Sequence, residues 1–223
     1  MIELVVTLTV LGSIGAGALA YLGFRKDARI KRAIRKAPHV KVSEFVEGTP
    51  AKLIGKLRFG TDTLVAPLTG RSCAFYQVNV EQQRGSDHNT RWPTVITDIE
   101  FVDFFLEDAS GRALIRLQAA EVVVVKDEHS KSGTFDKPTP QEQAFLDKHN
   151  VEGEAWGFNK ILRYREGVLE EGEIVAVMGL GAWEADPNPG AVPGDYRGTA
   201  RRLIMRTEGG TPLYVSDDPR TVR

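Results

Sequence analysis

LVVTLTVLGSIGAGALAYLGF, residues 4 to 24, is the stretch around which this chain is organised. It has twenty-one consecutive positions without a charged side chain. A helix of this length reaches about 30 Å, which is close to the thickness of the hydrocarbon core of a bilayer. The stretch therefore predicts a transmembrane anchor over residues 1–24.

A basic collar follows the apolar stretch directly. It contains one acid, Asp27, and seven basic residues: Arg25, Lys26, Arg29, Lys31, Arg32, Arg35 and Lys36. Such a collar is expected to meet anionic lipid headgroups, at about 1 kcal/mol for each basic residue near the surface. The positive-inside rule then places the N-terminus outside and the following domain in the cytoplasm. Ile30 and Ile34 are four residues apart, so we expect one helix over residues 25–37, with both isoleucines facing lipid or the domain.

A cleaved signal peptide is the other interpretation of the N-terminus. Ala18-Leu19-Ala20 has the small-x-small pattern of a cleavage site. A signal peptide would carry positive charge before its apolar run, whereas Met1, Ile2 and Glu3 stand there. The pattern favours an anchor that is retained.

Small residues recur within the apolar stretch. Gly12 and Ala16, and likewise Ala16 and Ala20, are four residues apart, and Gly17 follows Ser13 by the same spacing. A stripe of this kind lets two membrane helices approach closely. It predicts a possible homodimer through the transmembrane helix, although Gly and Ala are common in membrane helices generally.

Charge and cysteine content exclude several classes of protein. The chain has 223 residues and a net charge of −1, but the collar over residues 25–36 carries +6 and residues 37–223 carry −6. An acidic body argues against a nucleic-acid-binding protein, which would carry its basic patch on the folded domain. Cys73 is the one cysteine, so an intramolecular disulfide and a thiolate zinc finger are excluded.

Residues 38–216 predict a mainly β domain of the α+β class. Over 74–82, Tyr76, Val78 and Val80 alternate with polar residues, as in a half-buried strand. Thr139 and Glu142 form a capping box that opens one short helix, ending near His149. Further strands are expected at 40–46, 51–59, 64–67, 99–107, 112–117, 122–125, 160–169, 174–179, 202–206 and 213–216, with loops at 83–95, 126–138 and 184–199.

These strands suit an antiparallel barrel or a two-layer sandwich, and the pattern does not choose between them. The apolar run 122–125 is expected to be a central strand that is covered on both faces. Residues 217–223 are expected to fray as a C-terminal tail.

No catalytic, cofactor or metal motif stands out. The four histidines lack the spacing of a metal site. Residues 70–74, GRSCA, have a strand after them where a nucleophile elbow would need a helix. Cys73 beside Arg71 is interpreted as a small core residue. We therefore predict no cofactor, no metal and no catalytic residue.

Two segments together resemble a known family. They are Pro67 to Tyr76, PLTGRSCAFY, and Leu162 to Leu169, LRYREGVL, followed by Gly172 and by VAVMG at 175–179. The chain over about 38–215 resembles the GIDE, or beside-a-membrane, domain of membrane-anchored RING ubiquitin ligases of the MULAN/MAPL type. One cysteine cannot build a RING, so the resemblance implies a short, RING-less member of prokaryotic type and does not carry ligase activity over.

The function expected from these features is a single-pass, non-catalytic protein- or lipid-interaction module at the membrane surface. The expected contact residues are Gly70, Arg71, Tyr76, Arg91, Trp92 and Trp183, which lie at turns and loop edges. The tryptophans could equally turn inward as lids on the barrel. The rival is an enzyme, a hydrolase or ubiquitin-ligase-like component, with a site that Arg71 or Cys73 would form with a His and a carboxylate from elsewhere in the chain.

Overall fold

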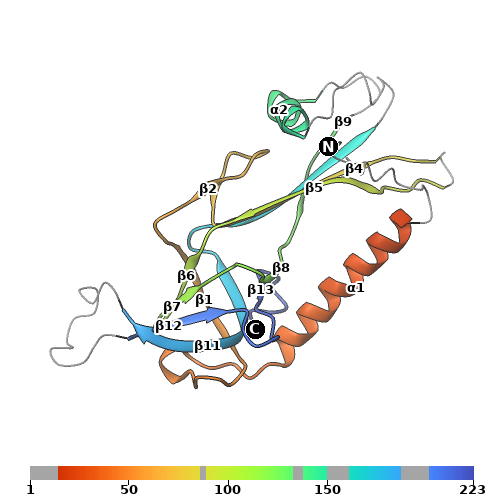
Figure 1. Cartoon of the computed structure of the whole chain (residues 1–223). Coiled ribbons are helices and arrows are strands. Elements are labelled where there is room, and N and C mark those ends of the chain that lie inside the picture. Colours follow the sequence, from red (N-terminus) through yellow and green to blue (C-terminus); the bar gives the residue numbers. More distant parts are fainter. Residues whose placement is uncertain (1–14, 86–88, 133–137, 150–160, 187–200) are drawn as a thin grey trace, which may run out of the picture.

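Five strands close into a small barrel at one end of the molecule (Figure 1). The computed structural model describes residues 15–85, 89–132, 138–149, 161–186 and 201–223. The barrel strands are β1 (Ala51–Phe59), β6 (Phe104–Asp108), β7 (Gly111–Ile115), β12 (Arg201–Arg206) and β11 (Ile174–Ala185), in that order around the barrel. The pairing of β1 with β11 closes it.

The strand directions identify the type of barrel. β7 and β12 run parallel, and the other neighbouring pairs run antiparallel. Counted along the chain, the barrel order is first, second, third, fifth, fourth, which is the order of the OB-fold, a five-stranded Greek-key barrel. Alternate side chains such as Leu57, Leu106 and Ile115 point inward and are fully buried. The barrel therefore encloses a filled core.

A four-stranded sheet is inserted into two connections of the barrel. Its order is β5 (Thr94–Phe101), β4 (Phe75–Gln82), β10 (Leu162–Leu169) and β9 (Asp127–Ser132). β4 and β5 lie between β1 and β6, whereas β9 and β10 lie between β7 and β11. One face packs its apolar residues against helix α2 (Pro140–Lys148) and against the segment with β2 (Leu64–Val65) and β3 (Ser72–Cys73). The sheet and α2 thus have a second core above the barrel.

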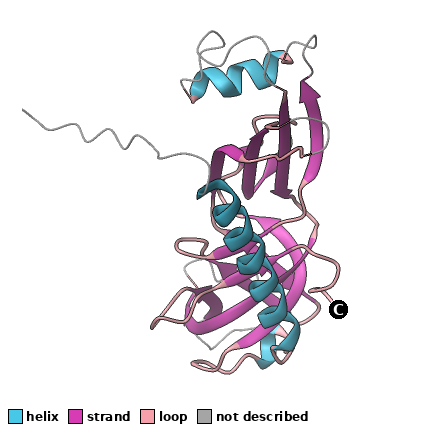
Figure 2. Ribbon diagram, turned by 90° about the vertical axis from the view of Figure 1, so that its right-hand side faces the viewer, coloured by secondary structure: helices cyan, strands magenta, loops and turns pink. Residues whose placement is uncertain are grey.

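Helix α1 (Gly15–Lys36) lies along the outside of the barrel (Figure 2). Ile30 and Ile34 are 1% and 0% exposed and pack against Val123 and Ala176. Val123 belongs to β8 (Glu121–Val123), which continues the barrel sheet through β13 (Tyr214–Ser216). The helix predicted for the collar is confirmed, and its isoleucines face the domain.

For most of the predicted anchor, the structure describes no side chains. Residues 1–14, and Gly12 with them, are outside the described residues, and at Ala16, Gly17 and Ala20 only the helical backbone is described. In the part of the chain that the structure does describe, no helix is both long and apolar enough to span a bilayer.

The mainly β class, the short helix and most strand positions are confirmed. α2 begins with the predicted capping box: Glu142 N donates to Thr139 Oγ1 (3.3 Å), and Thr139 N donates to Glu142 Oε2 (2.7 Å). The hairpin of β6 and β7 turns at the predicted place. The architecture combines a barrel with a separate sheet, where the sequence offered a barrel or a sandwich.

Four local predictions were wrong. Residues 42–44 form a 3-10 helix because Asp108 Oδ2 and Ser110 Oγ accept hydrogen bonds from Val42 N and Ser43 N (2.9 and 3.0 Å). The strand expected over 99–107 divides between the two sheets at Val102 and Asp103, since Asp103 Oδ1 accepts from Leu117 N (3.1 Å). The expected loop at 126–138 contains β9, and β8 lies at the end of its sheet.

The C-terminal residues, expected to fray, are ordered against α1. Asp218 is buried and forms an ion pair with Lys31 (2.7 Å). Thr221 is also buried, and its hydroxyl donates to the Asp218 carbonyl (2.7 Å). Val222 packs beside Ile30 and Ile34. The helix therefore receives contacts from the far end of the chain, which no local pattern could indicate.

Replacing Ile34 with Ala tests the packing of α1 on the barrel. The cavity left under the helix should lower the free energy of unfolding by about 3 kcal/mol. Denaturant unfolding of the full chain in detergent, followed by circular dichroism, measures the change. Arg35→Ala, one position away on the exposed side of the helix, is the control and should change stability by less than about 0.5 kcal/mol. Equal effects of the two changes would contradict the packing.

Candidate functional site

The two segments that carry the family resemblance meet in the structure. Glu166, on β10, is 1% exposed, and its carboxylate accepts hydrogen bonds from Leu68 N (2.9 Å) and from the Thr69 hydroxyl. Gly70 follows with φ of +69°, a backbone conformation that favours glycine. The buried carboxylate of one motif therefore shapes the turn of the other.

Gly167 allows a close approach beside this turn. A Cβ at this position would lie 2.5 Å from Val124 Cγ2 and 2.9 Å from the Val125 carbonyl oxygen. Any side chain here would push the strand β10 away from the segment that links β8 to β9. The glycine thus allows the sheet and the barrel to approach closely at their junction.

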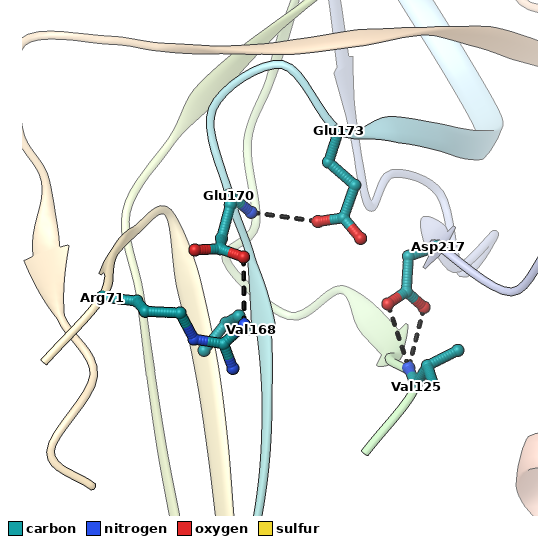
Figure 3. A pocket seen from close by; sticks show the side chains of 6 residues that line it. All are labelled: Arg71, Val125, Val168, Glu170, Glu173 and Asp217. Carbon is teal, nitrogen blue, oxygen red and sulfur yellow. Dashed lines mark hydrogen bonds and ion pairs between the residues drawn. The ribbon is translucent and has the colours of Figure 1, made fainter. Parts of the chain in front are cut away.

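A cleft of about 150 Å³ opens at this junction (Figure 3). Its walls come from the turn before β3, the connection from β10 to β11 and the segments after β8 and β13. The lining residues are Arg71, Val125, Val168, Glu170, Glu173 and Asp217. Three carboxylates and one guanidinium therefore share a small space.

Hydrogen bonds fix these charged groups. Arg71 Nη1 donates to Glu170 Oε2 (3.0 Å), and Glu170 N donates to Glu173 Oε2 (3.0 Å). Asp217 accepts from Val125 N with both oxygens, at 2.8 and 3.0 Å (Figure 3). The ion pair of Arg71 with Glu170 thus leaves two further carboxylates in the cleft.

Burial raises the pKa of Asp217 to about 7, and the nearby charge of Glu173 adds to the rise. Burial also raises the pKa of Glu173, helped by the charge of Glu170. Since an ordinary aspartate titrates near pH 4, Asp217 can take up a proton close to neutral pH. The charge of the cleft therefore changes in the physiological range. Among the described residues, no group of three or more His, Cys, Asp or Glu side chains is arranged to hold a metal ion.

Cys73 lies beneath the cleft and is 0% exposed. Burial raises the pKa of its thiol to about 11, and the charges of Glu166 and Glu170 act in the same direction. A thiol of this kind stays protonated, and the thiolate is the reactive form. The prediction that Cys73 is a small core residue fits this environment.

The other predicted contact residues lie apart. Tyr76 is buried in the core of the sheet. The guanidinium of Arg163 lies 4.5 Å from the centre of the Trp92 ring, near the exposed Arg91. Trp183 Nε1 donates to the Phe45 carbonyl (3.2 Å), and its ring packs against the barrel core.

Gly70 and Arg71 lie together in one turn, and the structure separates them from Arg91 and Trp92. Arg71 precedes β4, whereas Arg91 and Trp92 follow its far end. An eight-residue strand spans roughly 25 Å. Because the length of β4 lies between them, these predicted contact residues cannot all belong to one site.

The barrel has a second concentration of charge on its outer face. Its parallel strands β7 and β12 share a sequence pattern of two arginines four residues apart with an apolar residue midway. The first set is Arg112, Leu114 and Arg116, which directly follows β7, and the second is Arg202, the buried Ile204 and Arg206. The guanidinium of Arg112 lies 4.4 Å from the centre of the Phe105 ring, and Arg206 forms an ion pair with Glu184 (2.9 Å). Guanidinium groups in such a row can bind carboxylates or phosphates.

The collar residues divide between two sides of α1. Lys26 and Arg29 lie 3.7 and 3.2 Å from Glu121, and Lys31 pairs with Asp218. On the outward side Arg32, Arg35 and Lys36 are exposed. Part of the collar therefore binds the domain of its own chain, and part faces away from it. The side chain of Arg25 is not among those described.

Sequence reasoning missed most of the cleft. Glu166, Glu170 and Glu173 all lie in or just after the second motif, so the motif itself was the available signal. Asp217 comes from a segment about 44 residues further along the chain than Glu173, and no spacing rule links the two.

Comparison with protein-family models, with curated proteins and with solved structures gave no match for this chain.

Asp217→Asn should flatten the pH dependence of stability. The pKa of Asp217 is raised in the folded state, so the folded protein binds more protons than the unfolded chain between about pH 4 and pH 7, and stability falls as the pH rises. Asn keeps a carbonyl oxygen for Val125 N. We expect the wild type to lose roughly 1–2 kcal/mol more than the variant between about pH 5 and pH 8. Denaturant unfolding at each pH measures this. The exposed Asp62→Asn is the control and should follow the wild type, and a variant curve parallel to the wild type would refute the assignment.

Glu166→Gln tests the link between the two motifs. The amide cannot accept from both Leu68 N and the Thr69 hydroxyl as the carboxylate does, so stability should fall by about 2 kcal/mol. Thermal unfolding of the full chain in detergent measures the loss. Glu44→Gln, at an exposed position, provides the control and should stay within about 0.5 kcal/mol of the wild type. An unchanged midpoint for Glu166→Gln would show that the buried contact does not support the turn.

Proposed function

We propose that the protein is a membrane-anchored, non-catalytic interaction module that presents its barrel and sheet at the lipid surface. The observation that carries the proposal is the packing of α1. The described part of this helix runs from Gly15, inside the apolar stretch, to Lys36, and Ile30 and Ile34 pack it against the domain. An anchor that continues into such a helix would hold the domain in one orientation.

The charges on α1 support the same proposal. Lys26 and Arg29 both pair with Glu121 of the domain, and Lys31 pairs with Asp218. Arg35 and Lys36 lie three and four residues after Arg32, so both are neighbours of Arg32 on one side of the helix, and all three are exposed. A basic face next to an apolar segment suits an anionic leaflet. The cytoplasmic orientation and the single membrane crossing are part of this proposal.

Membership of the GIDE, or beside-a-membrane, family is also proposed, and it rests on the two motifs of the resemblance. The two motifs of the resemblance contact each other through Glu166, as parts of one structural unit would. The module would bind a protein partner beside the membrane, and anionic lipid would be its second ligand. No ubiquitin-ligase activity is included in the proposal.

The enzyme alternative rests on the cleft and is the weaker one. The cleft contains Arg71 and carboxylates, but the histidine that the enzyme interpretation also requires is not among its lining residues. Its nucleophile would be Cys73, whose thiol is buried and has a raised pKa. A buried, protonated thiol weighs against nucleophilic catalysis there.

Vesicle insertion tests the proposed function. The full chain is diluted from detergent onto vesicles of phosphatidylcholine, with or without phosphatidylglycerol, and the floated fraction is washed with alkaline carbonate. We expect a carbonate-resistant fraction on both vesicles. Reversal of the outward charges by Arg32→Glu, Arg35→Glu and Lys36→Glu should reduce insertion several-fold, and only on the anionic vesicles.

A matched triple reversal at exposed positions elsewhere, Lys41→Glu, Lys56→Glu and Arg84→Glu, controls for net charge and should leave insertion unchanged. Release of the wild type by carbonate would overturn the anchor. Equal losses in the two triple variants would overturn the role of the outward face.

A further inference from the structure

Neighbouring arginines lie on the outer face of the barrel strands β7 and β12. The inward side chains of these strands belong to the barrel core: Ala113, Ile115, Leu203 and Met205. Because successive side chains of a strand point to opposite faces, the residues between them point outward. In the parallel register Leu114 lies beside Ile204, and one position earlier Arg112 lies beside Arg202.

A second arginine pair lies at the other end of the same face. The ladder continues just past β7, where Arg116 N donates to the Met205 carbonyl (2.9 Å), and this places Arg116 beside Arg206. Adjacent strands are about 4.8 Å apart, so each pair brings two positive charges together. Like charges beside each other destabilise a sheet, and this face has two such pairs. An anionic group bound between the arginines would offset the repulsion.

The carboxylates of the domain satisfy these arginines only in part. Arg206 forms ion pairs with Glu184 (2.9 Å) and Glu208 (3.4 Å). Between described residues, no ion pair involves Arg116 or Arg202. The Nε atom of Arg202 is buried and has no hydrogen-bond partner in the described part of the chain. Buried donors are nearly always satisfied in native proteins, so this one calls for an acceptor that the domain does not supply.

Apolar side chains fill the space between the arginine pairs. Ile204 is 1% exposed, because Glu184 stands opposite Arg202 in the register and the side chain of Arg206 must pass over Ile204 to reach it. Leu114 keeps part of its surface accessible, and so does its neighbour on β6, Phe105. An apolar centre with arginines around it is the composition of a protein-binding surface.

Nucleic acid and lipid suit this face less well. Residues 37–223 carry a net charge of −6, which repels nucleic acid. Single strands also need open aromatic rings for their bases, and the guanidinium of Arg112 lies over the ring of Phe105. In the closed barrel β7 lies opposite the seam of β1 and β11, and α1 packs beside that seam on Ile54 and Ala176. The face is therefore across the barrel from the helix that we assign to lipid.

We propose that the outer face of β7 and β12 binds an extended acidic segment of a protein partner. This names the partner's chemistry for the interaction module, and it rests on the proposed function. The two arginine pairs are four residues apart along the strands, which is about 13 Å. An extended segment with the pattern Glu-x-Leu-x-Glu has the same spacing on one face. Its carboxylates would reach the two arginine pairs, with Arg116 and Arg202 as the arginines still to be satisfied, and its leucine would cover Leu114.

Peptide binding to the full chain in detergent tests the proposal. The probe is a fluorescein-labelled peptide of two Ser-Glu-Ser-Leu-Ser-Glu units, and fluorescence anisotropy measures Kd. We expect Arg116→Gln with Arg202→Gln to raise Kd at least about fivefold. The matched control, Arg32→Gln with Arg35→Gln on the exposed side of α1, should change Kd less than about twofold. Replacing the leucines of the peptide with serine should weaken its binding to the wild type and not to the Arg116 and Arg202 variant.

Thermal unfolding shows that a loss of binding is not a loss of fold. The midpoint of the Arg116 and Arg202 variant should not fall, since the like-charge pairs are relieved. If this variant does not fold, Arg116→Gln alone replaces it and should raise Kd at least about twofold.

Three results would overturn the proposal: no binding of the peptide, equal losses in the two double variants, or tighter binding of a twelve-residue oligothymidylate than of the peptide. Peptide binding by a chain that carbonate releases from vesicles would refute the anchor and retain this site. A carbonate-resistant chain that does not bind the peptide would refute this site alone.

Discussion

The pairing of β1 with β11 is the contact on which the remaining structure depends. Six residue pairs, from Ala51 with Gly179 to Lys56 with Ile174, close the barrel. The same two strands provide Ile54 and Ala176, which contribute to the surface under Ile30 and Ile34 of α1. The position of the helix is therefore set by the closure of the barrel.

A polar network joins the barrel to the sheet in a second way. Glu166 holds the turn with Leu68 and Thr69, and Arg71 at the end of that turn reaches Glu170. Glu170 and Glu173 lie on the connection that enters β11, so the network ends at the barrel. Buried carboxylates are costly unless their hydrogen bonds are satisfied, and here the bonds of Glu166 come from the one turn that the family resemblance singles out.

Local pattern was enough for much of the fold. Alternation identified β4, and the capping box at Thr139 identified α2, because both signals lie within a few residues. The charged sequence of β9 has no apolar alternation that would predict a strand. It forms a strand through its antiparallel pairing with β10. The division at Val102 was hidden because an apolar run continues across it while the strands on either side join different sheets.

The candidate site was harder to predict for a related reason. Arg71 was expected to matter, but its partners Glu170 and Asp217 come from distant segments that the topology brings together. The pKa of Asp217 depends on burial among those segments, which composition and spacing do not report. By contrast, the spacing of Ile30 and Ile34 and helix geometry predicted that they share one face. The contact of this face with the domain, the other alternative being lipid, is shown by the structure alone.

The interruption of the barrel by the sheet has a consequence for the order of folding. Residues 60–103 separate β1 from β6, and residues 116–173 separate β7 from β11. Both long separations cost chain entropy before β1 can meet β11, whereas the hairpin β6–β7 needs only a short turn. Nascent chains should therefore form this hairpin early and complete the barrel late, once β12 has been synthesised and can dock between its neighbours.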